Sequence, residues 1–137
     1  MFDIVVVFME NKAGKLAKIT KVLADNNINL FLSDIEDTGQ FGIFKFLTNE
    51  PGRAKDVLYN NNFTVALEKT VIVELEDKAG GLAGVAEILD RGGISITDAL
   101  GCILETGKKA VLTIRNDNPE KLEALLKQSG VKVLDTI

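Results

Sequence analysis

The sequence predicts an α+β protein built from two copies of a βαββαβ unit, each an antiparallel sheet with its helices on one face. The first observation is a repeat, because the segment Val71–Leu89 follows the pattern of Val5–Leu23 at an offset of 66 residues. The second is that each copy runs from a β-rich apolar stretch into a helical apolar period. The third is that the two prolines, Pro51 and Pro119, stand at matching places in the two copies.

The repeat divides the chain into two halves of nearly equal length. Nine positions carry the same residue type at the offset of 66: Val5, Val7, Glu10, Lys12, Ala13, Gly14, Leu16, Ala17 and Leu23 match Val71, Val73, Glu76, Lys78, Ala79, Gly80, Leu82, Ala83 and Leu89. A half of this length is near the smallest size that folds alone. We therefore expect two domains, residues 1–68 and 69–137, that pair closely.

Composition excludes several classes of function. The net charge is −4, and the lysines are scattered, so we expect no nucleic-acid partner. The apolar runs are too short to cross a bilayer, and the first residues do not resemble a signal peptide, so we expect a cytoplasmic protein without a membrane partner. With one cysteine, Cys102, and no histidine, we expect no metal, no cofactor and no enzyme activity.

The first copy begins with a predicted central strand over residues 2–9. The next element is a predicted helix that starts at Lys15 and ends at residues 25–27. Its buried stripe follows the i, i+3, i+7 spacing and consists of Leu16, Ile19 and Leu23.

A hairpin, a second helix and a last strand complete the first copy. The predicted hairpin strands cover residues 28–36 and 41–47, around a turn at residues 37–39. The second helix opens at Pro51, whose fixed φ suits the first turn. A fourth strand covers residues 63–67, and residues 68–70 are predicted to link the copies.

The second copy repeats this order. Its predicted strands cover residues 71–75, a segment beginning at Ile94, residues 110–115 and residues 131–134; its helices carry the stripes Leu82, Val85, Ala86, Leu89 and Leu122, Leu125, Leu126. Gly92-Gly93 ends the first of these helices, and Asn118 caps the second, which begins at Pro119.

The repeat offset grows from 66 to 68 within the second copy, because the turn around Gly107 matches the turn around Gly39 at the longer spacing. Two residues were therefore gained between Ile96 and Ile103. An even insertion keeps the two faces of a strand in phase. We expect Gly101-Cys102 to belong to a bulge or a longer strand.

The βαββαβ order is the ferredoxin-like plan. The loops Glu10-Asn-Lys-Ala-Gly-Lys-Leu16 and Glu76-Asp-Lys-Ala-Gly-Gly-Leu82, each between a strand and an amphipathic helix, resemble the ACT domain, a small regulatory module that binds amino acids. The resemblance covers both halves. It implies a pair of modules that share an extended sheet and bind an amino acid near their interface. It also implies a non-catalytic sensor read by an enzyme or regulator of amino-acid metabolism.

The resemblance assigns ligand contacts to the loop after the first strand and to the start of the second strand. In this chain these residues are Asn11, Lys12, Ala13, Gly14, Lys15, Leu16, Asn29, Leu30, Phe31 and Leu32 in the first half, and Asp77, Lys78, Ala79, Gly80, Gly81, Leu82, Ser95, Ile96, Thr97 and Asp98 in the second. The copies differ at one loop position, because Lys15 stands where the second copy has Gly81. We expect the chain to form a homodimer through exposed sheet edges.

The proposed ligand chemistry has local alternatives. A ligand carboxylate suits the N-terminus of a helix, and glycines at 14 and 80 would let the backbone approach it. The same glycines also suit simple turns. Asn11 and Asp77 either contact the ligand ammonium or cap their helices, and the lysines at 12 and 78 either contact the ligand or are solvated. The alternative function is an assembly module without a ligand.

Overall fold

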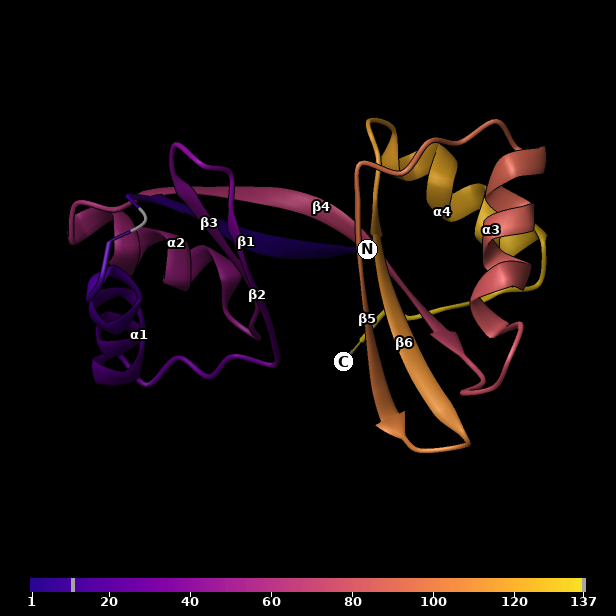
Figure 1. Ribbon diagram of the computed structural model, residues 1–137, viewed down its shortest axis with the longest axis horizontal. Coiled ribbons are helices and arrows are strands. Elements are labelled where there is room, and N and C mark those ends of the chain that lie inside the picture. The colour runs from indigo at the N-terminus through magenta and orange to yellow at the C-terminus, as the bar shows by residue number, and fades with distance from the viewer. Residues whose placement is uncertain (11, 137) are drawn as a thin grey trace. The chain divides into compact units, whose positions relative to one another are not determined.

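The computed structural model describes residues 1–10 and 12–136, and these form two compact units. One unit is Asp3–Glu68; the other is Lys69–Ile137 together with Met1–Phe2. Figure 1 labels the helices and strands of both units, apart from the short last strand.

The first unit is a sheet with two helices. Its elements are β1 (Phe2–Met9), α1 (Lys15–Asp25), β2 (Leu32–Asp37), β3 (Gly42–Leu47), α2 (Pro51–Asn60) and the first part of β4 (Thr64–Leu75). The strand order is β2-β3-β1-β4, and β3 is antiparallel to both of its neighbours. The predicted βαββαβ order is therefore confirmed in this half.

The second unit has the same element order. It contains the second part of β4, α3 (Gly81–Arg91), β5 (Asp98–Glu105), β6 (Lys109–Arg115), α4 (Pro119–Gln128) and the short β7 (Lys132–Val133). β5 pairs with β6, while β6 and β7 both pair with β4, all antiparallel. The predicted fold class, two ferredoxin-like repeats with the helices on one face, is confirmed.

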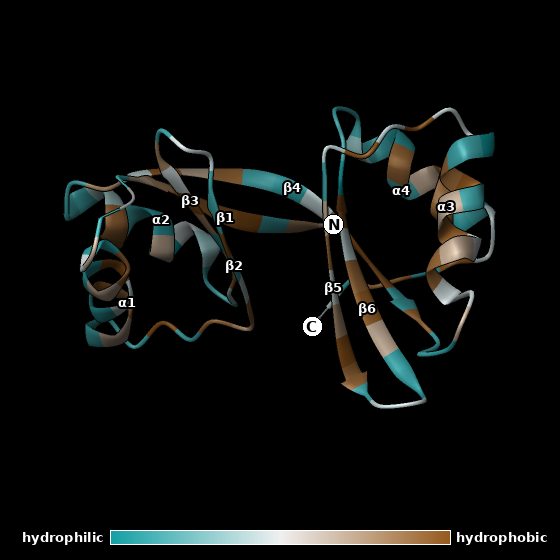
Figure 2. Ribbon diagram, viewed as in Figure 1, coloured by the Kyte–Doolittle hydropathy of each residue, from teal (hydrophilic) through white to brown (hydrophobic). Residues whose placement is uncertain are grey.

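Each unit has its own hydrophobic core between sheet and helices. Alternate residues of β1 pack against α1 and α2 in a cluster of Val5, Val7, Met9, Ile19, Leu23, Ile28, Phe44, Phe46, Ala54 and Leu58. The second cluster is Val71, Val73, Val85, Leu89, Ile94, Leu112, Ile114, Leu122 and Leu126. The helices alternate between hydrophilic and hydrophobic colours along their length in Figure 2, as expected of helices with one buried stripe.

The predicted apolar stripe of α3 is wrong at two of its four positions. Leu82 of α3 is 60% exposed, and Ala86 is exposed as well, although both were assigned to the stripe. The buried residues of α3 are Val85 and Leu89. Leu82 lies in the first turn of α3.

The second strand of each copy begins four residues later than predicted. The predicted starts were Ile28 and Ile94, but β2 begins at Leu32 and β5 at Asp98. The Ile28 N–H donates to Leu23 O over 2.9 Å, and the Ile94 N–H donates to Leu89 O over the same distance. These buried isoleucines therefore close the ends of α1 and α3 instead of joining the sheet.

The predicted linker at residues 68–70 is wrong, because β4 continues through it. Thr70 is fully buried, and its hydroxyl donates to Ile114 O over 3.2 Å. Glu68 and Lys69 are exposed. Two charged residues in sequence suggested a loop, but a β-branched residue with a satisfied hydroxyl fits a buried strand position.

The two-residue gain lengthens a strand, as predicted. β5 has eight residues where β2 has six. Its pairing with β6 is regular from Asp98 to Ile103 and shifts between Ile103 and Glu105. Gly101 and Cys102 thus lie in the regular part of the strand, and the irregularity falls beside them.

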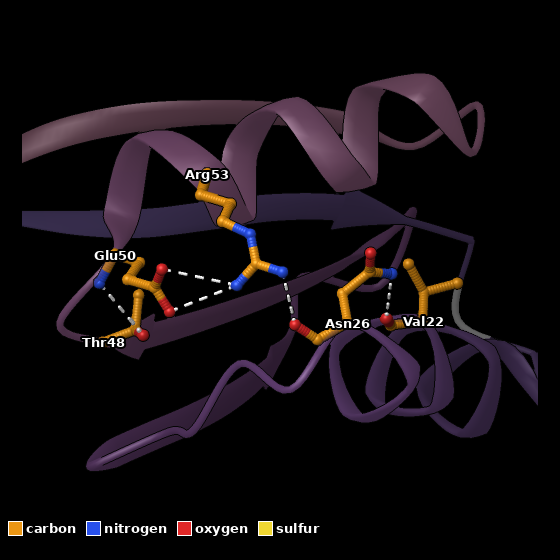
Figure 3. A network of polar contacts seen from close by, with 5 residues as sticks. All are labelled: Val22, Asn26, Thr48, Glu50 and Arg53. Carbon is orange, nitrogen blue, oxygen red and sulfur yellow. Dashed lines mark hydrogen bonds and ion pairs between the residues drawn. The ribbon is translucent and has the colours of Figure 1, made fainter.

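Polar contacts secure several helix ends. In the first unit, Arg53 of α2 donates to the carbonyl oxygen of Asn26 over 2.7 Å and to the Glu50 carboxylate over 3.3 Å (Figure 3). The guanidinium thus supplies a donor to a carbonyl at the end of α1, where backbone acceptors lack helical partners. In the second unit, Asn118 Oδ1 accepts from the Lys121 N–H over 3.1 Å, which confirms the predicted cap of α4.

Candidate functional site

The loops between the first strand and first helix of each copy end in the same backbone conformation. Gly14 and Gly80 are the N-cap residues of α1 and α3, with φ of 89° and 88°. L-residues other than glycine rarely adopt this left-handed region. The turn by itself therefore accounts for both glycines, whether or not a ligand approaches them.

The starts of α1 and α3 lack a side-chain cap, whereas α4 is capped by Asn118. The first helical backbone bonds run from Lys18 N to Gly14 O and from Gly84 N to Gly80 O, both over 3.0 Å. Because glycine has no side chain, neither N-cap residue can offer an acceptor to the first-turn N–H groups. The N–H of the first helical residue already has a partner, since Lys15 N donates to Lys12 O over 3.2 Å and Gly81 N donates to Lys78 O over 3.1 Å. The other N–H groups of the first turn are the donors that suit an anion.

Asp77 does not cap α3, although capping was one of its two predicted roles. Its carboxylate accepts the Gly107 N–H over 2.6 Å, and its own N–H donates to Lys108 O over 3.2 Å. Asp77 therefore attaches the loop after β4 to the turn between β5 and β6. Asn11, its counterpart in the first copy, lies outside the described residues.

The loop lysines form short-range ion pairs. Lys12 Nζ lies 2.7 Å from Glu10 Oε2, and Lys78 Nζ lies 2.6 Å from Glu76 Oε2. Hydrogen bonding to these ammoniums, with their charge, lowers the pKa of both glutamates. All four side chains are largely exposed, which agrees with the solvated interpretation of the two lysines.

The copies differ at the first helical residue for a steric reason. A Cβ added at Gly81 would lie 2.7 Å from the carbonyl oxygen of Glu76, which is closer than side chains come to backbone. The second loop therefore needs glycine here. The first copy carries Lys15 at the matching position, so its loop accommodates a side chain there.

Each unit has an open cleft beside its loop, and the two clefts occupy matching positions of the repeat. The cleft of the first unit, about 480 Å³, is lined by Phe8, Met9, Glu10, Lys15, Lys18, Phe41, Asn61, Asn62, Phe63 and Thr64. The cleft of the second unit, about 590 Å³, is lined by Glu74, Leu75, Glu76, Lys78, Gly81, Gly84, Val85, Ile88, Lys108, Lys109, Gly130, Val131 and Lys132. Of the predicted site residues, Lys15, Lys78 and Gly81 line these clefts.

The predicted second-strand residues lie away from the loops of their own unit. In the first unit β1 ends at Met9, which pairs with Gly42, and Gly42 pairs with Asp37 at the far end of β2. Leu32 pairs instead with Leu47. The start of β2 is thus about 17 Å along the sheet from the edge that carries the loop.

The second unit shows the same separation. Leu75 pairs with Ala110, and Ala110 pairs with Ile103, whereas Asp98 pairs with Arg115 at the other end of β6. The Asp98 carboxylate accepts from Arg115 Nε over 3.1 Å. Neither unit by itself brings the predicted loop residues and strand residues together.

Most predicted site residues are accessible. Those that are exposed are Lys12, Ala13, Gly14, Asn29, Phe31, Lys78, Ala79, Gly80, Leu82, Ser95, Ile96 and Thr97; those partly buried are Lys15, Leu16, Leu30, Leu32, Asp77, Gly81 and Asp98. Phe31 is 40% exposed and Ile96 is 45% exposed. Apolar side chains this exposed are available to contact a ligand or a second protein surface.

The charged residues of the second cleft were not predicted from the sequence. Glu74 binds two lysines, with Oε2 3.1 Å from Lys109 Nζ and Oε1 3.1 Å from Lys132 Nζ. Hydrogen bonds from Lys109 and then Lys132 lower the pKa of Glu74. The three residues come from β4, β6 and β7, and no spacing in the sequence signals that they meet.

Among residues 1–10 and 12–136, no group of three or more His, Cys, Asp and Glu side chains could hold a metal ion. Within the same residues, every helix is too short or too polar to cross a membrane.

The chain matches a known protein family over nearly its whole length. The family model described as "ACT domain pair" matches residues 2–135. No curated protein sequence matches the chain. The crystal structure of protein BT0572 from Bacteroides thetaiotaomicron is 31% identical, with a TM-score of 0.90, and the match covers 97% of this chain and 91% of that one.

Two more distant structures share the fold. The ligand-free regulatory subunit of aspartate kinase from Thermus thermophilus is 13% identical with a TM-score of 0.64, over 93% of this chain and 91% of that one. The regulatory subunit of aspartate kinase from Thermus flavus is 14% identical with a TM-score of 0.60, over 95% and 94%.

Proposed function

The chain belongs to the family of ACT domain pairs, and from this premise we propose that it is a non-catalytic regulatory protein that binds a free amino acid. ACT domains are regulatory modules whose ligands are small molecules and often amino acids. Two structures that share the fold are described as regulatory subunits of aspartate kinase. By analogy, we propose that an enzyme or regulator of amino-acid metabolism reads the bound state.

The observation that carries the proposal is the pair of open helix starts behind the repeated loop. α1 and α3 both begin at a left-handed glycine that cannot cap the helix with a side chain. A ligand carboxylate would accept the first-turn N–H groups that follow those of Lys15 and Gly81, which already donate to Lys12 O and Lys78 O. The helix dipole would also favour it. α4, by contrast, has Asn118 in this role and needs no ligand.

The proposed site draws on two copies of the chain. The loop residues 12–16 and 77–82 and the strand residues 29–32 and 95–98 lie at opposite ends of their own sheets. A site that uses both groups would therefore take its strand residues from a second copy of the chain. We propose a homodimer, since β2 and β5 end their sheets with unpaired edges.

The first test is a thermal-shift screen of the full chain against the twenty amino acids. A ligand at 100 times its Kd stabilises the native state by about 2.7 kcal/mol, which raises Tm by several degrees. A selective rise for one or two amino acids is the expected result. If none of them binds more tightly than millimolar, the proposal fails and the assembly module is favoured.

A pair of matched variants tests the location. Ala13 and Ala79 are exposed loop residues directly before the two N-cap glycines. Replacing both with Glu places negative charge at the helix starts, where it is compatible with folding but repels a carboxylate. We expect the Glu variant to lose the amino-acid shift and the Ala13→Gln/Ala79→Gln control to keep it. Equal shifts in both variants would exclude the helix starts as the carboxylate site.

A further inference from the structure

The two clefts occupy matching positions but differ in chemistry. In the first unit, Phe8 and Phe41 lie with ring centroids 6.1 Å apart and ring planes tilted by 56°. Their counterparts at offsets of 66 and 68 in the second unit are Glu74 and Lys109, which form an ion pair. Aromatic side chains thus line one cleft where charged side chains line the other.

The cleft of the second unit has an excess of positive charge. Four lysines line it against two glutamates: Lys78, Lys108, Lys109 and Lys132 against Glu74 and Glu76. Lys108 is also paired with Glu105, which lies outside the lining. The cleft of the first unit has two lysines and one glutamate. Because lysines concentrated in a concave site raise the local concentration of anions, the second cleft is the one suited to a multiply charged anion.

The lysines of the second cleft retain donor capacity. Within residues 1–10 and 12–136, Lys109 and Lys132 each contact the Glu74 carboxylate, and Lys78 contacts Glu76. An ammonium has three N–H donors, so a single carboxylate partner leaves others for a ligand. The Glu74 carboxylate is paired with Lys109 and Lys132, so a ligand anion would share these two ammoniums with it.

The walls of this cleft are joined to each other. Lys78 lies on the loop after β4, Lys108 lies in the turn before β6, and Lys109 is the first residue of β6. Asp77 connects these segments, because it accepts the Gly107 N–H over 2.6 Å and donates its own N–H to Lys108 O over 3.2 Å. The lysines are therefore brought together before any ligand arrives, which reduces the ordering cost of binding.

We propose that the cleft of the second unit binds a small molecule with a compact dianionic group, such as a phosphate ester or a dicarboxylate, between Lys78, Lys109 and Lys132. The remaining N–H donors of these three ammoniums are the groups that would bind the two negative charges. The cleft lies within one unit and needs no second module. This inference therefore goes beyond the amino-acid site and can fail while that site stands.

The test measures binding of inorganic phosphate and of succinate to the full chain by isothermal titration calorimetry, against chloride at equal ionic strength. We expect binding of at least one dianion that chloride does not reproduce. Which of the two binds more tightly separates a phosphate ligand from a dicarboxylate. Binding of neither dianion beyond that of chloride overturns the proposal.

Three variants locate the site. Lys109→Gln/Lys132→Gln should weaken dianion binding about tenfold or more, since two charged hydrogen bonds are lost. Lys15→Gln/Lys18→Gln, which removes the same charge from the first unit, should leave it unchanged. Equal weakening in both double variants means that general attraction, not this cleft, holds the anion, and overturns the proposal.

The third variant separates a binding role from a structural one. Glu74→Gln removes the carboxylate that competes for Lys109 and Lys132, so dianion binding should tighten several-fold. Unchanged or weaker binding in Glu74→Gln, with the circular dichroism spectrum of the wild type, would overturn the assignment. If the dianion signal fails but the amino-acid thermal shift remains, only the cleft proposal falls.

Discussion

Replacing Gly80 with alanine isolates the conformational requirement of the repeated loop. Gly80 has a φ of 88° and is the N-cap residue of α3. A Cβ built on it meets nothing within 4 Å, so the substitution creates no steric overlap with the rest of the chain. The cost then comes from holding an L-residue in the left-handed region, about 1–2 kcal/mol.

Gly84, four residues later, supplies a control in which alanine should raise the free energy of unfolding instead of lowering it. It lies inside α3, is exposed, and also has nothing within 4 Å of an added Cβ. Alanine is favoured over glycine in a helix interior by about 0.8–1 kcal/mol. The two Gly→Ala variants should therefore differ in the free energy of unfolding by about 2–3 kcal/mol, although each adds the same methyl group.

Urea unfolding followed by circular dichroism measures this difference, with the m-value showing whether the extent of unfolding is unchanged. We expect the midpoint to fall for Gly80→Ala and to rise for Gly84→Ala. If Gly80→Ala is neutral or stabilising in the absence of ligand, the backbone does not need glycine there. The glycine would then have to be explained by something other than the turn.

The remaining predictions concern side chains. Asn118→Ala removes the cap of α4 and should lower the free energy of unfolding by about 1 kcal/mol, whereas Asn118→Asp should retain most of it; equal losses in urea unfolding would contradict the capping role. The pKa of Glu74, lowered by Lys109 and Lys132, should rise toward its ordinary value in Lys109→Gln when the carboxyl carbon is titrated by NMR, and an unchanged value would contradict the ion pair. The lysines stabilise the ionised carboxylate of Glu74, so its pKa is lower in the folded than in the unfolded state. Its contribution to the free energy of unfolding is therefore present above the unfolded pKa and lost as the pH falls through the folded pKa. The difference in stability between wild type and Glu74→Gln should narrow over that pH range.

The repeated loops of the candidate site could be located from the sequence, but the residues that other strands bring beside them could not. The repeated loops, with Gly14 and Gly80 before the two helices, are where the pattern placed them, because a left-handed turn and an amphipathic helix are local properties. The ionic cleft around Glu74 was missed. Its residues come from three strands, and which side chains meet across strands depends on pairing register rather than on local composition.

By itself the sequence determined the two βαββαβ copies, their helix positions and the lengthened strand β5, because periodicity, turn residues and the repeat offset are all written in the order of residues. Only the tertiary structure decided where β2 and β5 begin, since Ile28 and Ile94 close helix ends and fill cores instead of pairing. It also decided that β4 runs through residues 68–70, where Thr70 is buried in the strand although the two residues before it are charged and exposed. Strand limits and side-chain clusters depend on contacts between residues distant in sequence, and those contacts exist only after the chain has folded.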